Sequence, residues 1–222
     1  MIITAITRYG DKGNRYRVDV DGEYWYILAD TLIMDFHLRK GKEVTEELLT
    51  EIKEAAEYRK GRERAFYLLE SRDHSKSELA AKLARHCDWE MARRIADEME
   101  SLGLIKEDVY AKRLAEYLST SRKQGPRRIR QEMMKRGIPR DLIEEALADL
   151  ETDEDALIEL VRRKYGRYLM PTEEEEEPSA FSRGFSKGKN KALQALLRLG
   201  HSYGESLAAI EAVEEELAEE AE

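Results

Sequence analysis

Residues 107–150, EDVYAKRLAEYLSTSRKQGPRRIRQEMMKRGIPRDLIEEALADL, decide the fold, because they contain three helical segments separated by short turns. Apolar residues of the first segment recur at intervals of three and four, which places them on one helix face. These residues are Tyr110, Leu114, Tyr117 and Leu118. Pro126 and Pro139 open the second and third segments, where the missing N–H of proline costs no helical hydrogen bond. The stretch therefore predicts three short amphipathic helices.

The same plan precedes this stretch, so the chain contains an internal repeat. A shift of 50 residues places Leu79 on Ile129 and Leu83 on Met133. The helix that follows in each unit aligns with a shift of 51 residues, so the difference of one residue falls in a turn. A helical triplet of this size cannot bury its apolar faces alone, and stacked triplets can.

Helix boundaries in the earlier unit are also marked by residue type. Ser75 and Glu78 form the sequence pattern of a capping box, in which each side chain binds a free backbone N–H of the other residue. Asp88 can cap the next helix, and Gly103 can end it in the left-handed conformation. We therefore expect one helix to begin after Ser75 and the next after Asp88.

A third triplet is weaker in sequence. Its predicted helices lie at 152–166, 189–200 and 204–217. Between the first two lies an insertion near 169–188 that is rich in Glu, Gly and Ser, a composition typical of a mobile loop.

Residues 1–29 have the pattern of β-structure instead. The runs RYRVDV (15–20) and EYWYIL (23–28) flank Asp21 and Gly22, and Asp-Gly between such runs is a strong hairpin signal. The run at 2–7 predicts a third strand. Thr45 is a suitable N-cap for a helix that would cover this small sheet.

Together these patterns predict a mainly α fold with three tandem three-helix repeats in an elongated, curved array, preceded by a small β-hairpin-containing N-terminal unit. The predicted boundaries are 1–60 for the N-terminal hairpin and helix, 61–106 for repeat 1, 107–151 for the basic repeat 2, and 152–222 for repeat 3 with its insertion.

Charge is distributed unevenly along the chain. The protein has 222 residues and a formal net charge of −9, yet Lys112 to Arg140 contains ten basic residues against two acidic ones, Glu116 and Glu132. The run 173–177 is all Glu, and the C-terminal end is also acidic. The basic residues form the predicted binding surface for a partner or DNA: Lys112, Arg113, Arg122, Lys123, Arg127, Arg128, Arg130, Lys135, Arg136 and Arg140.

Two interpretations of the basic section stay open. In the first, its side chains contact phosphates or an acidic protein face, and counterion release makes that contact strong and salt-dependent. In the second, it is a solvated helix face balanced by Glu144 and Glu145. We favour the first because the excess of basic residues is so one-sided. A helix-turn-helix that reads duplex DNA fits poorly, because its recognition helix would be acidic beyond Arg140.

Other functional classes find little support. No apolar run approaches the ~20 residues needed to span a membrane, and the N-terminus lacks the pattern of a secretory signal. Cys87 is the sole cysteine, which fits a reducing cytoplasm. The four histidines show no metal-ligand spacing with Cys or carboxylates, and no nucleophile, base and orienting acid can be assembled. We expect no cofactor, no metal and no enzymatic activity.

The segment RGFSKGKNK (183–191), at the end of the insertion, contains the glycines and lysines that are typical of a phosphate-binding loop. The spacing of Gly184 and Gly188 is one residue too short for a phosphate-binding loop, and Asn190 stands where Ser or Thr would bind Mg²⁺. Phe181 and Phe185 could still stack on bases or dock a partner. A disordered insertion explains the composition equally well.

The segments HSKSEL (74–79) and 102–147 resemble the RecX family of bacterial recombination regulators. The positions that match the family pattern are His74, Ser75, Glu78, Leu79, Gly103, Asp108, Tyr110, Ala111, Arg122, Gly125, Ile129, Gly137, Ile138, Ala146 and Leu147. The resemblance covers roughly 60–217, and the first 60 residues look like the N-terminal extension of RecX proteins from Gram-positive bacteria.

The resemblance implies a cytoplasmic, non-catalytic monomer that binds the RecA recombinase and its filament on single-stranded DNA. RecX proteins lie in the filament groove, inhibit strand exchange and ATP hydrolysis, and limit filament growth. On this basis we expect weak binding to DNA alone. The alternative is a stand-alone nucleic-acid-binding protein that uses the same basic repeat.

Overall fold

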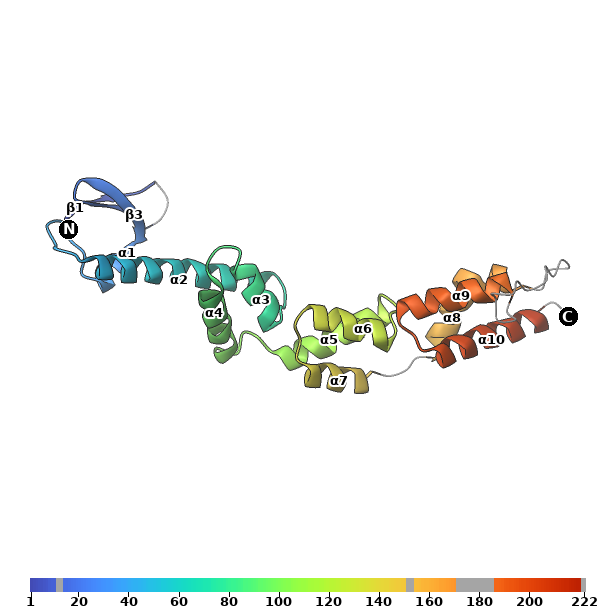
Figure 1. Ribbon diagram of the computed structural model, residues 1–222. Helices are drawn as coiled ribbons and strands as arrows, with labels where there is room; N and C mark the ends of the chain where they lie inside the picture. The colour runs from blue at the N-terminus through green and yellow to red at the C-terminus, as the bar shows by residue number, and fades with distance from the viewer. Residues whose placement is uncertain (11–13, 151–153, 171–185, 221–222) are drawn as a thin grey trace. The chain divides into compact units, whose positions relative to one another are not determined.

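The computed structural model describes residues 1–10, 14–150, 154–170 and 186–220. These residues form two compact units, Met1–Ile105 and Lys106–Glu222, and each is described by itself (Figure 1). The described chain is mainly helical with a small sheet at its N-terminus, which confirms the predicted fold class.

The sheet of the first unit has three antiparallel strands in the order β1 (Ile3–Arg8), β2 (Arg15–Val20) and β3 (Glu23–Ala29). Asp21 and Gly22, with φ of 52° and 91°, form the turn between β2 and β3. Positive φ at both positions matches the right-handed twist of the strands, so the predicted hairpin is confirmed.

Four described helices complete the first unit: α1 (Asp30–Asp35), α2 (Glu46–Ser71), α3 (Lys76–Leu83) and α4 (Trp89–Ser101). The caps agree with the predictions. The Thr45 hydroxyl accepts from the backbone N–H of Leu48, Ser75 and Glu78 form the complete capping box, and Asp88 caps α4.

Helix α2 runs without a break past the predicted boundary at 60/61, so the N-terminal unit and repeat 1 share one helix. Gly61 lies in the middle of α2, where α4 packs against it. A Cβ atom at Gly61 would lie 2.4 Å from Cδ1 of Ile95. The glycine therefore permits close packing of the helices and does not end the helix. The first half of α2 packs on the sheet, and the second half packs on α3 and α4.

The second unit contains six described helices: α5 (Glu107–Thr120), α6 (Pro126–Lys135), α7 (Arg140–Ala148), α8 (Glu154–Leu169), α9 (Lys187–Leu199) and α10 (Tyr203–Glu219). Two separate hydrophobic cores hold them. One joins α5, α6 and α7, and the other joins α8, α9 and α10. Each triplet thus has a core of its own, contrary to the expectation that a triplet cannot bury its apolar faces alone. The two triplets meet through other contacts, described below.

The structure narrows the insertion predicted near 169–188 at both ends. Helix α8 extends to Leu169, and α9 begins at Lys187. Most of it, with the Glu run and both phenylalanines, lies outside the described residues. Gly188 belongs to the first turn of α9, where a Cβ atom would lie 1.8 Å from the carbonyl oxygen of Tyr168. Gly188 therefore serves the packing of α9 against α8. It shares its residue type with the glycines of a phosphate-binding loop, but not their role.

Among the described helices, none is both long enough and apolar enough to cross a membrane. A search of the same residues finds no group of three or more His, Cys, Asp or Glu side chains placed to hold a metal ion.

Candidate anion-binding surface

Helix α6 is the centre of the basic section, and packing determines which of its side chains can reach a ligand. Ile129 and Met133 are fully buried against α5 and α7. On the other side of the helix Arg127 is exposed, while Arg128 and Arg130 are half-buried. Arg127 therefore lies opposite the core residues, whereas Arg128 and Arg130 flank Ile129, one on each side of it.

Arg130 is held by a carboxylate of the following helix. Its Nε and Nη2 donate to Oε1 and Oε2 of Glu144 at 2.9 and 2.8 Å. This two-point contact raises the pKa of Arg130 and lowers the pKa of Glu144. Such a pair orients the guanidinium, but it also neutralises part of its charge.

Lys112 on α5 is bound in a similar way. Its Nζ lies 2.8 Å from Glu145 and 3.0 Å from Asp149, both on or just after α7. Hydrogen bonds to these carboxylates, first to Glu145, raise the pKa of Lys112. Glu144 and Glu145 thus balance part of the basic section, as the second interpretation of the sequence expects.

Glu132 does the same within α6. It lies 3.1 Å from Arg128 and 3.4 Å from Lys135, one turn away in each direction. The three side chains form a local network on the exposed side of the helix, in which one negative charge faces two positive charges.

Two further arginines contact tyrosines of α5. Arg136 donates to the Tyr110 hydroxyl at 2.8 Å, and Arg122 donates to the Tyr117 hydroxyl at 3.0 Å while it lies over that ring. The pattern of apolar residues places both tyrosines on a core face. Tyr110 is buried there, but Tyr117 is 46% exposed, so that prediction is wrong for Tyr117. The pattern also does not show that their hydroxyls orient arginines.

The remaining predicted residues are Arg113, Lys123 and Arg140. Arg113 and Arg140 are exposed, and the charge of Arg140 adds to the lowering of the pKa of Glu144 that Arg130 causes. Lys123 lies in the turn before α6 with φ of 53°. The structure thus places Arg127, Arg128, Arg130 and Lys135 on α6 and spreads the others over α5, the turns and α7.

The N-terminus of α6 meets the C-terminus of α9 end to end (Figure 1). The backbone N–H of Gly125 donates to the Leu199 carbonyl at 2.9 Å, and that of Arg127 donates to the Gly200 carbonyl at 3.2 Å. Helix N-termini leave N–H groups free and helix C-termini leave carbonyls free, so the two ends satisfy each other. No side chain caps α6, which makes these carbonyls its cap. We call this contact the α9–α6 joint.

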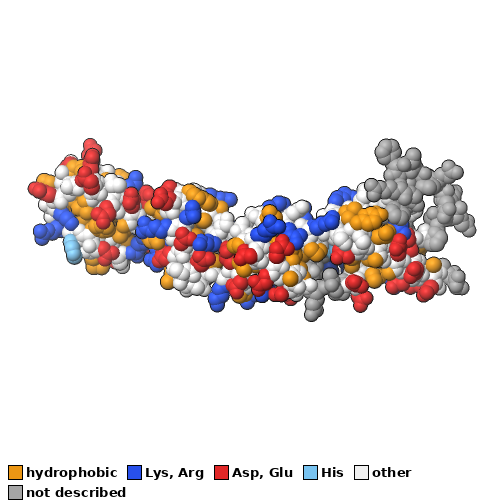
Figure 2. All heavy atoms as spheres, turned by 60° about the horizontal axis from the view of Figure 1, so that its bottom comes forward, with side chains coloured by type: hydrophobic (Ala, Val, Ile, Leu, Met, Phe, Trp, Pro, Cys, Tyr) orange, Lys and Arg blue, Asp and Glu red, His pale blue; other side chains and the backbone are white. Residues whose placement is uncertain are grey.

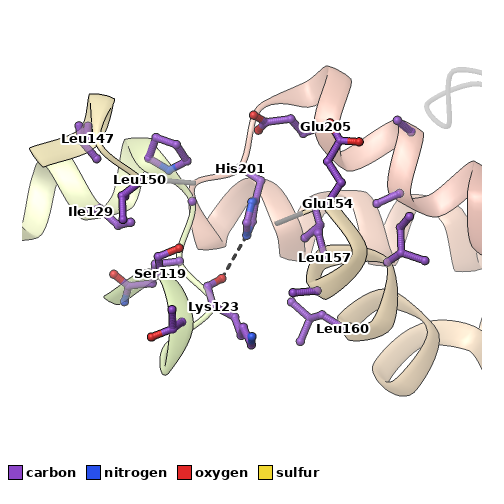
Figure 3. Close-up of a pocket in the computed structure, with 18 of the residues that line it drawn as sticks. Ser119, Lys123, Ile129, Leu147, Leu150, Glu154, Leu157, Leu160, His201 and Glu205 are labelled. Atoms are coloured by element: carbon purple, nitrogen blue, oxygen red, sulfur yellow. Dashed lines mark hydrogen bonds between the residues drawn. The ribbon is translucent and has the colours of Figure 1, made fainter. Parts of the chain in front are cut away.

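A groove of about 460 Å³ lies beside the joint, between the two triplets of the second unit (Figure 3). Ile129, Leu157 and Leu160 contribute to its apolar lining, with His201 at one edge. The His201 Nε2 lies 3.1 Å from the Lys123 carbonyl oxygen, as the dashed line in Figure 3 marks. Neither the joint nor the groove follows from the sequence, because they depend on glycines and turns rather than on periodic residues.

The visible face of the second unit carries Lys and Arg side chains mainly toward its upper edge in Figure 2, and Asp and Glu side chains mainly toward its lower edge near the C-terminus. Oriented guanidinium groups with this separation of charge can bind phosphate oxygens or carboxylates. The surface is suited to recognition of an anion, because its charged groups are positioned by packing and by hydrogen bonds.

Comparisons with known proteins match this geometry to one family. The model of the second three-helix domain of RecX matches residues 107–147, which span α5, α6 and most of α7. The regulatory protein RecX of Clostridioides difficile is 30% identical over 169 residues, which cover 75% of this chain and 79% of that relative. The regulatory protein RecX of Levilactobacillus brevis is 27% identical over 209 residues, or 90% of this chain and 77% of that relative.

Solved structures give the same fold. A crystal structure of regulatory protein RecX covers 96% of this chain with a TM-score of 0.65 at 22% identity. The crystal structure of RecX from Lactobacillus salivarius covers 74% of this chain with a TM-score of 0.56 at 24% identity.

Proposed function

The chain belongs to the RecX family, and on that premise we propose that it is a regulatory protein that binds RecA and the RecA filament on single-stranded DNA. It inhibits the recombinase and its ATP hydrolysis and limits filament growth. It acts in the cytoplasm as a monomer, without a cofactor. The relatives' name, regulatory protein, supports the coarse part of this proposal, and the arrangement of α6 supports the fine part.

The observation that carries the proposal is the oriented arginine face of the middle triplet. Arg127 lies opposite a fully buried core position, Ile129, and Arg128 and Arg130 flank that position. Glu132 and Glu144 hold these two flanking arginines in place. A RecA–DNA filament presents DNA phosphates, and we expect it also to present acidic protein surface. Since each contact with a phosphate releases counterions, binding to such a polyanion would depend strongly on salt.

Inhibition in this mechanism comes from occupancy alone. The protein binds along the filament and blocks it in proportion to the amount bound, with no bond made or broken. The net charge of −9 keeps the free protein away from bulk DNA. The local excess of basic groups acts once the protein lies against the filament.

ATP hydrolysis by RecA on single-stranded DNA tests the proposal. We expect the wild-type protein to inhibit hydrolysis in proportion to its concentration. The variant with Arg127→Gln, Arg128→Gln and Arg130→Gln should need about tenfold more protein for the same inhibition, and its inhibition should depend less on salt. Glutamine is preferable to a reversed charge, because Arg128 and Arg130 lie beside carboxylates.

A matched control removes the same charge elsewhere: Lys53→Gln, Arg64→Gln and Arg93→Gln on exposed positions of α2 and α4. It should inhibit as the wild type does. If the wild-type protein binds single-stranded DNA tightly and leaves RecA activity unchanged, the alternative of a stand-alone nucleic-acid-binding protein replaces the proposal. If the α6 variant inhibits like the control at every salt concentration, the basic face is only a solvated surface.

A further inference from the structure

Tyr168, near the end of α8, has two cations next to its ring. The residue Tyr168 is 38% exposed. The Arg167 guanidinium carbon lies 4.6 Å from the centre of the tyrosine ring, and the Lys191 Nζ lies 3.9 Å from it. The phenol also interacts with both groups. Hydrogen bonding to Lys191, then to Arg167, lowers the pKa of Tyr168. Proteins that bind single-stranded nucleic acids combine an exposed aromatic side chain, on which a base stacks, with nearby cations that contact phosphates.

The packing around Tyr168 is rigid. The first turn of α9 lies so close to the Tyr168 carbonyl that only glycine fits at position 188. The next residue, Leu169, is buried in the core of the third triplet. Tyr168 is therefore held on a fixed backbone, and little freedom would be lost when a ligand stacks on it.

Cations of the third triplet differ in their surroundings. Lys189 points toward α10 and contacts Glu211 and Glu214, and Arg162 contacts Glu216 and Glu220. Lys191 instead lies on the exposed side of α9 with its ammonium over Tyr168. The carboxylates of α10 thus form ion pairs with the cations that face this helix, Lys189 and Arg162. The side of α9 that carries Lys191 remains basic.

The exposed side of α9 continues toward the middle triplet. Lys191 and Arg198 are seven residues apart, so they lie on one face about 10 Å apart along the helix. Beyond Arg198 the α9–α6 joint connects this face to the start of α6, where Arg127 is exposed. The joint therefore places the start of α6 at the end of α9. There a hydrogen bond from the Ser202 backbone is the main cause that lowers the pKa of Glu205 on α10, and the charge of Arg127 contributes to that lowering.

We infer that the third triplet has its own binding site for single-stranded nucleic acid, in which one base stacks on Tyr168 and the adjoining phosphates contact Lys191 and Arg198. The base takes the place of one of the two cations over the ring, and that flexible side chain moves to a phosphate. A duplex hides its base faces, so the site selects single strands. This site goes beyond the proposed function, because it requires no recombinase.

Binding of a fluorescently labelled oligothymidine, followed by anisotropy at low salt, tests this site. Stacking of one base on an aromatic side chain is worth about 1–3 kcal/mol, so we expect Tyr168→Ala to weaken binding about tenfold. Tyr168→Phe keeps the ring and should bind within about twofold of the wild type. The control is Tyr203→Ala on α10, where the tyrosine is 43% exposed, and it should not change binding.

Lys191→Gln should reduce the slope of log affinity against log salt concentration by about 0.7, the value for one phosphate contact on a single strand. Binding of a duplex of the same length should not distinguish Tyr168→Ala from the wild type. Equal affinities of Tyr168→Ala and wild type for the single strand would overturn the inference, as would an equal loss for the duplex or for Tyr203→Ala.

Photocrosslinking gives a second readout that does not depend on affinity. With 5-iodouracil in the strand, we expect the crosslinked peptide to contain Tyr168, and crosslinks confined to other peptides would contradict the site. Failure of this site is distinguishable from failure of the proposed function. If inhibition of RecA still depends on the arginines of α6 while Tyr168→Ala has no effect on single-strand binding, only the inference about the third triplet is wrong.

Discussion

Gly125 and Gly200 face each other across the α9–α6 joint, and neither position has room for a side chain. A Cβ atom on Gly125 would lie 2.5 Å from the Gly200 carbonyl oxygen, and one on Gly200 would lie 2.4 Å from the Arg128 backbone nitrogen. Gly200 also has φ of 94°, a conformation that strains other residues. The contact between the middle and third triplets therefore depends on two glycines that are 75 residues apart in the chain.

Gly200→Ala should open the joint. The added methyl group strains the backbone and pushes against α6, with an expected loss of about 1–3 kcal/mol in stability. Amide hydrogen exchange is the suitable measurement, because the N–H groups of Gly125 and Arg127 are the donors across the joint. Both should exchange faster. Gly204→Ala, where no atom lies within 4 Å of the added carbon, should leave their exchange unchanged; unchanged exchange in Gly200→Ala would contradict the role of the joint.

Glu144→Gln should strengthen binding to a polyanion, because it removes the carboxylate that neutralises Arg130. The pair is exposed to solvent, so we expect only a small loss of stability. Affinity for the RecA filament should rise severalfold, with a steeper dependence on salt. Glu63→Gln, which removes the same charge from the Arg59 pair on α2, is the control and should leave affinity unchanged. Weaker binding by Glu144→Gln would mean that orientation of Arg130 matters more than its charge.

Ile129→Asp should unfold the middle triplet. Ile129 is 0% exposed, and burial of a carboxylate there would cost more than about 3 kcal/mol. Met134→Asp, on the same helix at 61% exposure, should fold normally. Circular dichroism during thermal unfolding will separate the two variants. Equal melting temperatures would show that α6 does not contribute its Ile129 face to a core.

The stability of the first unit should fall below about pH 6.5, the ordinary pKa of histidine. His74 is buried, its Nδ1 lies 2.9 Å from the Arg72 carbonyl oxygen, and its Nε2 lies 2.6 Å from the Lys82 ammonium. Burial is the main cause that lowers the pKa of His74 in the folded state. The unfolded chain therefore binds the proton at a higher pH than the folded chain, so acid favours unfolding.

Urea unfolding followed by tryptophan fluorescence measures this effect, because both tryptophans, Trp25 and Trp89, belong to the first unit. His74→Gln should be less stable at neutral pH but should lose less stability between pH ~7.5 and ~5.5 than the wild type. An equal loss in both proteins would assign the acid sensitivity to other groups.

The sequence by itself determined the elements and their polarity. Residue periodicity identified the core faces that contain Ile129 and Met133, and caps such as Ser75 and Asp88 identified helix starts. These features are local, since a helix face and a cap each depend on residues within four positions of one another. The Asp21–Gly22 turn was predictable for the same reason.

Only the tertiary structure decided how those elements meet. The predicted boundary falls at 60/61, yet α2 continues through it, and Gly61 leaves room there for Ile95 of α4. The sequence left open whether carboxylates balance the basic section, and the structure shows that Glu132, Glu144 and Glu145 hold some of its cations while Arg127 stays exposed. These outcomes depend on atoms that are distant in the chain and close in space, and no local pattern carries that information. The α9–α6 joint is the clearest case, because its hydrogen bonds join backbone groups whose residue types leave many partners possible.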